Sequence, residues 1–299
     1  MPHTRVLSLC LALVAALCLS NGSLAFAQQA PPPAPSPDPI PTSSPTPSEI
    51  ELNTIDLPTT MSLGRHKSYF RLTHRFARDL RRGDFSGLAA DLFSLDTGAI
   101  IGLEYRFAIT GNLHAGIHRS LLSKTIQTFA KLDVLRQGES FPVAVSVMGS
   151  YEGLNNLREH HQPGVAVTVS RTIGNVVALY ATPAFVNGTQ AVDIVEGHED
   201  HGIELGGNDS HSDEDHTWFT GFGARLRFSR SGYIVGEYTP RISGYDPNAD
   251  TWGLAIEKRT AGHTLQVNFT NTFATTLGQL SRGGNKGQVL LGFNITRRF

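Results

Sequence analysis

Apolar and polar residues alternate with a period of two along most of the chain after residue 68. The segment 287–299 shows the alternation most clearly, with Leu291 and Phe293 on one face and Gly292 and Asn294 on the other. Because successive side chains of a β-strand point to opposite faces, this pattern predicts strands with one apolar and one polar face. The pattern recurs in about twelve segments, at 69–76, 101–107, 113–117, 126–134, 143–151, 165–169, 176–183, 218–228, 233–238, 252–256, 264–273 and 287–299.

A soluble β-sandwich alternates in the same way, so other features must decide between it and a membrane barrel. Aromatic residues such as Tyr105, Trp218 and Phe273 lie near the ends of the apolar faces, as an interfacial girdle requires. The opposite faces carry Gly, Thr, Gln, Asn, Glu and Arg, which would be costly in a sandwich core. The connections also alternate between tight ones, such as 229–232, and long ones, such as 187–216. The sequence therefore predicts an all-β fold, a transmembrane antiparallel up-and-down β-barrel of about 12 strands.

The N-terminal region predicts an export signal and a tether. Arg5, an apolar run over 6–19 and the small residues Ala25 and Ala27 indicate a secretory signal peptide over 1–27. Nine prolines follow between residues 31 and 47, a composition that favours extended polyproline II. We therefore expect a signal peptide at 1–27, a Pro-rich disordered linker at 28–50 in the periplasm, and an outer-membrane β-barrel at 51–299.

Charge and cysteine content exclude several classes of protein. The formal net charge is −1, which argues against a nucleic-acid partner. Both cysteines, Cys10 and Cys18, lie in the predicted signal peptide. The exported chain would then carry no thiol, which excludes disulfides, cysteine-ligated zinc and a cysteine nucleophile.

The C-terminus and several internal stretches resemble known outer-membrane proteins. The last strand ends in Phe299, which resembles the assembly signal of bacterial outer-membrane proteins and implies insertion into the lipid bilayer by the barrel-assembly machinery of a Gram-negative cell. The stretches 57–60, 72–76, 92–98 and 131–137 are similar to a family of presumed outer-membrane proteins known as a membrane-bound beta-barrel domain of unknown function. The resemblance covers about 57–299 and implies location and architecture, with no catalytic or ligand-binding residues.

Charged residues on the polar faces are candidates to line the barrel lumen. They could form the constriction of a narrow, porin-like pore or transporter for a small solute, or a polar network that plugs the barrel. Twelve strands enclose a bore between that of a filled eight-stranded barrel and that of an open sixteen-stranded porin. The lumen-lining candidates are Glu104, Arg106, His114, His118, Arg225, Arg227, Glu257 and Arg259.

The predicted loop 187–216 has a chemistry of its own. Nine carboxylates fall between residues 193 and 215, and four histidines are interleaved with them. Imidazole and carboxylate are ligands for divalent metals, and a solvated acidic loop is the alternative. The metal-ligand candidates are His198, His201, His211 and His216. Beyond such a divalent metal, the sequence indicates no cofactor.

Two other functions remain open beside the pore. One is a structural, adhesive or metal-capturing surface barrel with a plugged lumen. The other is an outer-membrane hydrolase with catalytic groups at the rim, such as His74, His160 or His216. The chain has no Gly-x-Ser-x-Gly motif for an acyl hydrolase, so we expect no enzyme.

Overall fold

The computed structural model describes residues 49–138, 140–189, 215–246 and 249–299, and the strands among them form one antiparallel sheet. Its strands are β1 (Ser68–Asp79), β2 (Ala99–Ala108), β3 (Leu113–Ser120), β4 (Ile126–Leu135), β5 (Ala144–Gly153), β6 (Glu159–Ile173), β7 (Val177–Asn187), β8 (His216–Arg227), β9 (Gly232–Thr239), β10 (Arg241–Gly244), β11 (Thr251–Arg259), β12 (His263–Thr270) and β13 (Leu290–Arg298). Short helical segments lie in the connections, namely α2 (Phe85–Ala90), η1 (Leu92–Ser94), η2 (Leu122–Lys124), α3 (Leu154–Leu157) and α4 (Leu277–Ser281).

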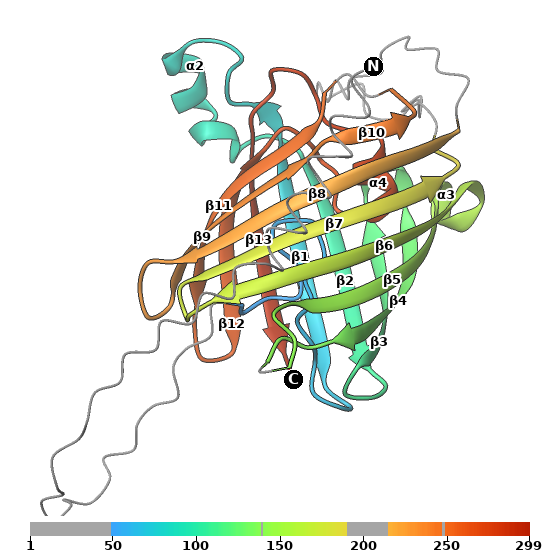
Figure 1. Ribbon diagram of the computed structural model, residues 1–299. Coiled ribbons are helices and arrows are strands. Elements are labelled where there is room, and N and C mark those ends of the chain that lie inside the picture. Colours follow the sequence, from blue (N-terminus) through green and yellow to red (C-terminus); the bar gives the residue numbers. More distant parts are fainter. Residues whose placement is uncertain (1–48, 139, 190–214, 247–248) are drawn as a thin grey trace, which may run out of the picture.

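The sheet closes into a barrel, which Figure 1 shows from the side. β1 pairs with β13, and β8 pairs with β9, which joins the two ends of the sheet. β9 and β10 are separated only by Pro240, whose ring nitrogen has no hydrogen to donate to the ladder, so the two segments are one interrupted strand. The barrel therefore has 12 strands, and the predicted fold is confirmed.

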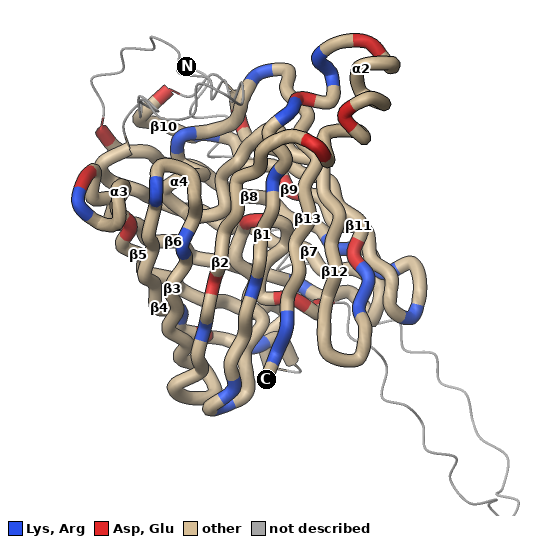
Figure 2. Tube along the Cα trace, turned by 180° about the vertical axis from the view of Figure 1, so that it is seen from behind, with Lys and Arg blue, Asp and Glu red and all other residues tan. Residues whose placement is uncertain are grey.

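The barrel wall is apolar outside and polar inside. β12 alternates between exposed and buried residues along its whole length. Large apolar side chains on the outer face, such as Leu103, Ile117 and Leu254, are 44–52% exposed, whereas Arg71 and Glu104 are buried. Figure 2 shows charged residues at mid-height of the strands as well as at both ends. An outer surface of this kind suits a lipid bilayer.

The two ends of the barrel differ in their connections. At one end, here called the short-turn end, the turns at 109–112, 174–176, 228–231 and 260–262 are short, and the C-terminus lies there (Figure 1). At the other, the long-loop end, residues 80–98 join β1 to β2. No helix within the described residues is long and apolar enough to cross a membrane. The predicted tight connections are found, but the connection expected to be long over 152–163 comprises only residues 154–158, because β6 begins at Glu159.

Two predicted strands were too long. β13 begins at Leu290, three residues after the predicted start at 287. The alternation suggested a strand over 264–273, but β12 ends at Thr270 and Phe273 is buried instead of lying in an outer girdle. The Asn271 side chain accepts a hydrogen bond from the Trp252 N–H at 2.8 Å and donates to the Asp250 carbonyl, which turns the chain away from the wall. The residues that follow fold into the barrel.

Two segments that are not part of the wall fill the lumen. The first comprises residues 49–63, here called the plug segment, and residues 50–60 of it are buried. The second comprises residues 271–289, here called the inner loop, which connects β12 to β13 and contains α4. Residues 271–281 of the inner loop are buried as well. The interior of the barrel is therefore built from main chain in addition to wall side chains.

Candidate functional site

The plug segment forms a tight turn inside the barrel. The Thr54 N–H donates to the Leu57 carbonyl at 2.9 Å, and the Thr59 N–H donates to the Leu52 carbonyl at 3.0 Å. The turn residues 54–57, here called the plug tip, are almost fully buried. Both arms of the turn reach the short-turn end, where Arg298 of β13 contacts the Ile50 carbonyl. The segment thus enters from the short-turn end and returns there to begin β1.

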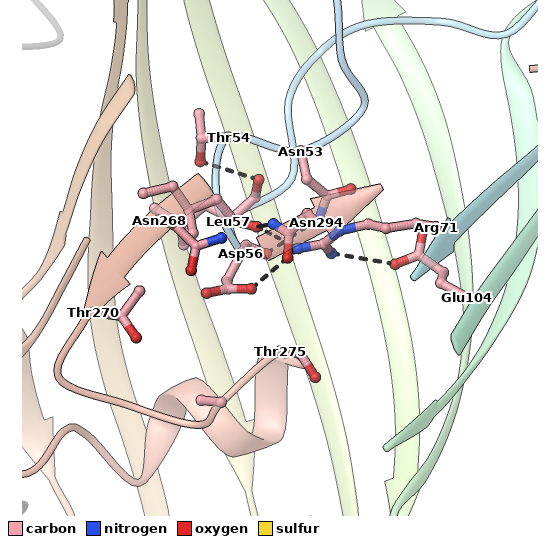
Figure 3. A network of polar contacts seen from close by, with 12 residues as sticks. Asn53, Thr54, Asp56, Leu57, Arg71, Glu104, Asn268, Thr270, Thr275 and Asn294 are labelled. Carbon is pink, nitrogen blue, oxygen red and sulfur yellow. Dashed lines mark hydrogen bonds and ion pairs between the residues drawn. The ribbon is translucent and has the colours of Figure 1, made fainter. Parts of the chain in front are cut away.

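Two arginines of β1 hold the carboxylate of the plug tip. Asp56 Oδ1 lies 3.1 Å from Arg71 Nη2 and 2.9 Å from Arg75 Nη2. Arg71 also contacts the Ile55 carbonyl and lies 3.6 Å from Glu104, as Figure 3 shows in part. All of these side chains are buried, so the two positive charges and the carboxylate depend on one another for compensation.

A carboxylate of β9 holds the backbone of the plug tip from another side. Glu237 Oε2 accepts hydrogen bonds from the N–H groups of Ile55 and Asp56 at 3.0 Å and of Leu57 at 3.3 Å. It also accepts one from the Thr54 hydroxyl at 2.8 Å. Consecutive backbone N–H groups that converge on one anion form a nest, which stabilises the bend of the chain.

The carbonyl groups of the plug segment are paired by wall side chains. Arg225 donates to the Asn53 carbonyl at 2.9 Å, and Gln266 donates to the Thr54 carbonyl at 2.9 Å. Lys131 donates to the Met61 carbonyl at 2.7 Å. Buried backbone groups need such partners, because an unpaired one costs about 1–3 kcal/mol. The wall and the plug segment are therefore complementary in hydrogen bonding.

The inner loop enters from the long-loop end and uses different contacts. The Thr276 side chain accepts a hydrogen bond from the Gln279 N–H and so caps α4. The Gly278 N–H donates to Glu152 at 3.1 Å, and the Ser281 hydroxyl lies 2.9 Å from that of Thr189. These contacts fix the loop against β5 and the end of β7.

The plug segment and the inner loop meet in an apolar cluster. Leu57 of the plug tip packs with Leu277 and Leu280 of the inner loop and with wall residues such as Phe129 and Phe219. Beside this contact a residual cavity of about 20 Å³ remains, which is room for about one water molecule. The lumen is therefore closed at this height in the structure.

Most of the predicted lumen-lining residues lie in the interior just described. Glu104 contacts Arg106 and lies 3.3 Å from His118, and Arg225 forms an ion pair with Glu257 at 2.8 Å. Arg227 is half-buried and Arg259 is exposed, because both lie where their strands reach the short-turn end. The buried candidates are Glu104, Arg106, His114, His118, Arg225 and Glu257.

Sequence reasoning missed the residues that contact the plug tip. Arg71 and Arg75 occupy alternate positions of the predicted strand 69–76, so its period of two could have placed them in the lumen. Glu237 lies in the predicted strand 233–238, on the face opposite the apolar one. The same period of two could have placed it in the lumen. Nothing in the local pattern around Asp56 indicated that it would enter the barrel.

The metal-ligand prediction falls mostly on residues that the structure does not describe. His198, His201 and His211 lie outside the described residues. His216 begins β8, and its ring centroid lies 6.0 Å from that of Phe185. Within the described part of the chain, no group of three or more His, Cys, Asp or Glu could hold a metal ion. Metal binding by the loop 187–216 stays a prediction.

The histidines considered for a rim hydrolase lie on three different strands. His74 is on the outer side of β1, where its ring stacks on Phe293 at 4.7 Å. His160 is exposed at the beginning of β6, and His216 begins β8. The chemistry concentrated in the described residues is therefore that of the lumen.

Comparison with known proteins agrees with this architecture. The family model described as "Membrane bound beta barrel domain (DUF5777)" matches residues 51–299, which confirms the resemblance seen in the sequence. No curated protein matches the chain. Similar solved structures are the KdgM porin in complex with disordered oligogalacturonate (8% identity, 78% of this chain and 99% of that chain, TM-score 0.45), the COG4313 outer membrane channel from Pseudomonas putida F1 (12%, 79% and 97%, 0.45) and the Acinetobacter baumannii outer membrane protein Omp33 (9%, 80% and 100%, 0.40). These likenesses concern the barrel shape alone.

Proposed function

The chain belongs to this family of membrane-bound β-barrel domains, and from that premise we propose that it is a gated channel for a small solute across the bacterial outer membrane. The plug segment is its gate. The observation that carries the proposal is that a polar, charged wall surrounds a segment that is not part of the wall. The structure then represents the closed state, and no catalysis is involved.

The size of the barrel supports a gate. In an eight-stranded barrel the wall side chains alone fill the interior, whereas the bore grows with strand number. Here the 12 strands enclose more space than their side chains occupy, and the plug segment and the inner loop take up the rest. If the plug segment leaves, the remaining bore is lined by groups that water can solvate.

The wall keeps its polar character where the plug segment lies. Arg71, Arg225 and Lys131 are buried cations, and Glu237 and Glu257 are buried acids. A permanently sealed interior has no need of such groups, since apolar residues of similar volume are often as stable as a buried ion pair. A bore that admits water and solute does need them.

The orientation follows from the connections. Outer-membrane barrels have short turns in the periplasm and long loops outside. The short-turn end would then face the periplasm, so that the plug segment enters from that side. The predicted signal peptide and Pro-rich linker precede the plug segment in the chain and fit this placement.

Planar-bilayer conductance tests the channel. We expect the full chain to be closed for most of the time, and a variant in which a Gly-Ser linker replaces residues 49–63 to show stepwise openings. As a control, the same linker should replace the largely exposed residues 84–93 of the β1–β2 loop, which leaves the lumen filled. If the barrel without the plug segment inserts and stays silent, the protein is a structural barrel and the channel proposal is wrong.

A further inference from the structure

Asp56 of the plug tip contacts charged side chains on two different strands of the wall, β1 and β9. The Asp56 carboxylate lies 3.1 Å from Arg71 and 2.9 Å from Arg75, both on β1. The backbone N–H of the same residue donates to Glu237 of β9 at 3.0 Å. Asp56 thus presents its backbone nitrogen to Glu237 and its carboxylate to the two arginines. Two carbon atoms, Cα and Cβ, separate this nitrogen from the carboxylate.

The arginine end of this site has more donors than the plug segment uses. Arg71 Nη1 and Arg75 Nε are buried and have no hydrogen-bond partner among the described residues. Arg71 Nη1 lies 3.6 Å from Glu104, which is longer than a hydrogen bond. Because buried unpaired donors cost free energy, this cluster is not optimised for Asp56 alone and can donate to further carboxylate oxygens.

At the Glu237 end of the site, the plug tip supplies the hydrogen-bond donors and Glu237 accepts them. One oxygen of Glu237 accepts hydrogen bonds from three backbone N–H groups and the Thr54 hydroxyl. When the plug tip leaves, this carboxylate loses all four donors at once. An ammonium group carries three N–H donors and a positive charge, so it is a small group that can replace them.

We propose that Arg71, Arg75 and Glu237 form a binding site for a small zwitterionic solute whose amino group and carboxylate are two carbon atoms apart. β-Alanine and the side-chain end of aspartate have this spacing. The site is occupied by Asp56 when the channel is closed and by the solute when it is open. The inference rests on the proposed channel function, because a solute reaches the site only after the plug tip has left.

The spacing of the site predicts an order among simple amino acids. We expect the barrel without residues 49–63, purified in detergent, to bind β-alanine in isothermal titration. Glycine is one carbon shorter and γ-aminobutyrate one carbon longer, so each should bind about tenfold more weakly, since each loses one of the two charged contacts. The titration requires no conduction, so its failure is distinguishable from failure of the channel proposal.

Substitutions separate the two ends of the site. Arg75→Gln should weaken the binding of both β-alanine and acetate, whereas Glu237→Gln should weaken β-alanine alone. Arg78→Gln changes an arginine of the same strand whose guanidinium contacts the Gly87 carbonyl and Asp91 in the β1–β2 loop, and it should leave both affinities unchanged. Equal binding of glycine, β-alanine and γ-aminobutyrate, or equal effects of the three substitutions, would overturn the proposal.

The full chain provides a second test that does not depend on deleting the plug segment. Asp56→Ala leaves Arg71 and Arg75 without their carboxylate. Acetate should enter the space and slow hydrogen exchange of the amides of residues 49–63 in this variant, and chloride at equal ionic strength should not. The wild-type chain should not respond to either salt. If acetate and chloride act alike on the variant, there is no carboxylate site. This test of the proposal holds even if the barrel without residues 49–63 does not assemble.

Discussion

The plug segment and the inner loop both fill the lumen, but different interactions hold them. The wall holds the plug tip through ion pairs of Arg71 and Arg75 with Asp56 and through backbone hydrogen bonds to Glu237, and Ile55 and Leu57 of the tip are buried in apolar clusters. The inner loop buries Leu277 and Leu280 and is joined to a strand at each of its two ends. Among the described residues, the chain links the plug segment to the wall on one side only, through residues 64–67, which lead into β1.

This difference indicates which of the two segments can leave the lumen. Groups that are charged or hydrogen-bonded regain water when they separate, so the free-energy cost of their separation is small in a bore that water fills. Apolar side chains, which in the plug segment include Leu52, Ile55 and Leu57, regain nothing on exposure to water. The plug tip is held in part by groups that water can solvate, whereas the inner loop is tied to a strand at both ends, so we assign the plug segment as the gate and the inner loop as a fixed constriction.

The largest effect is expected from the charge contact of the plug tip. Asp56→Ala leaves Arg71 and Arg75 buried without a carboxylate, which should destabilise the closed state by about 3–5 kcal/mol. Hydrogen exchange of the amides of residues 49–63 should become faster in consequence. The melting temperature of the barrel should change little, because the wall keeps its hydrogen-bonded ladder. A loss of barrel stability without faster exchange in the plug segment would contradict the comparison.

A smaller effect is expected from the apolar contact of the inner loop. Leu280→Ala removes a buried side chain from the cluster around Leu57 and should lower the free energy of unfolding by about 3 kcal/mol. The matched control is Leu265→Ala on the outer face, where detergent or lipid fills the space, and its loss should be smaller. Urea unfolding in detergent measures both. If the two variants lose equal stability, the inner loop is not held by packing.

The smallest effect is expected from a loop that lies outside the lumen. Asp84 caps α2, and its pKa lies below the ordinary 3.8 because the Gly87 N–H and the Ser86 hydroxyl donate to its carboxylate. Its cap is therefore fully present above the ordinary pKa and is lost as the pH falls through the lowered one. Amide protection at Gly87 should fall with acid, while Asp84→Asn should keep it constant. Any change in lumen conductance with this substitution would contradict the separation of loop and gate.

The sequence predicted the wall because a membrane barrel imposes one rule on every strand. Lipid requires apolar residues outside, so segments such as 264–270 and 291–296 alternate strictly, and 12 strands could be recognised from that pattern. The buried positions of Glu104, Arg225 and Glu257 follow from the same rule. Arg71 and Arg75 obey it as well and could have been placed in the lumen.

The filling of the lumen could not be predicted in this way. The contact between Glu51 and Thr296 joins residues 245 positions apart, and that between Thr54 and Glu237 joins residues 183 positions apart. The plug segment combines apolar and polar residues in no strict period, so its local pattern favours neither a strand nor an interior position. Its place depends on complementarity to a wall that exists only after the barrel has closed.

Reversible cross-linking of the plug segment in a planar bilayer tests the central claim most directly. The hydroxyl oxygens of Thr60 and Ser170 lie 2.5 Å apart, so Thr60→Cys with Ser170→Cys can form a disulfide between plug segment and wall. Thr189→Cys with Ser281→Cys does the same for the inner loop, where the oxygens lie 2.9 Å apart. We predict that oxidation of the first pair abolishes channel openings until a reductant is added, while oxidation of the second leaves them unchanged. Openings that persist with the plug segment cross-linked, or that stop only when the inner loop is cross-linked, would contradict the assignment of the plug segment as the gate.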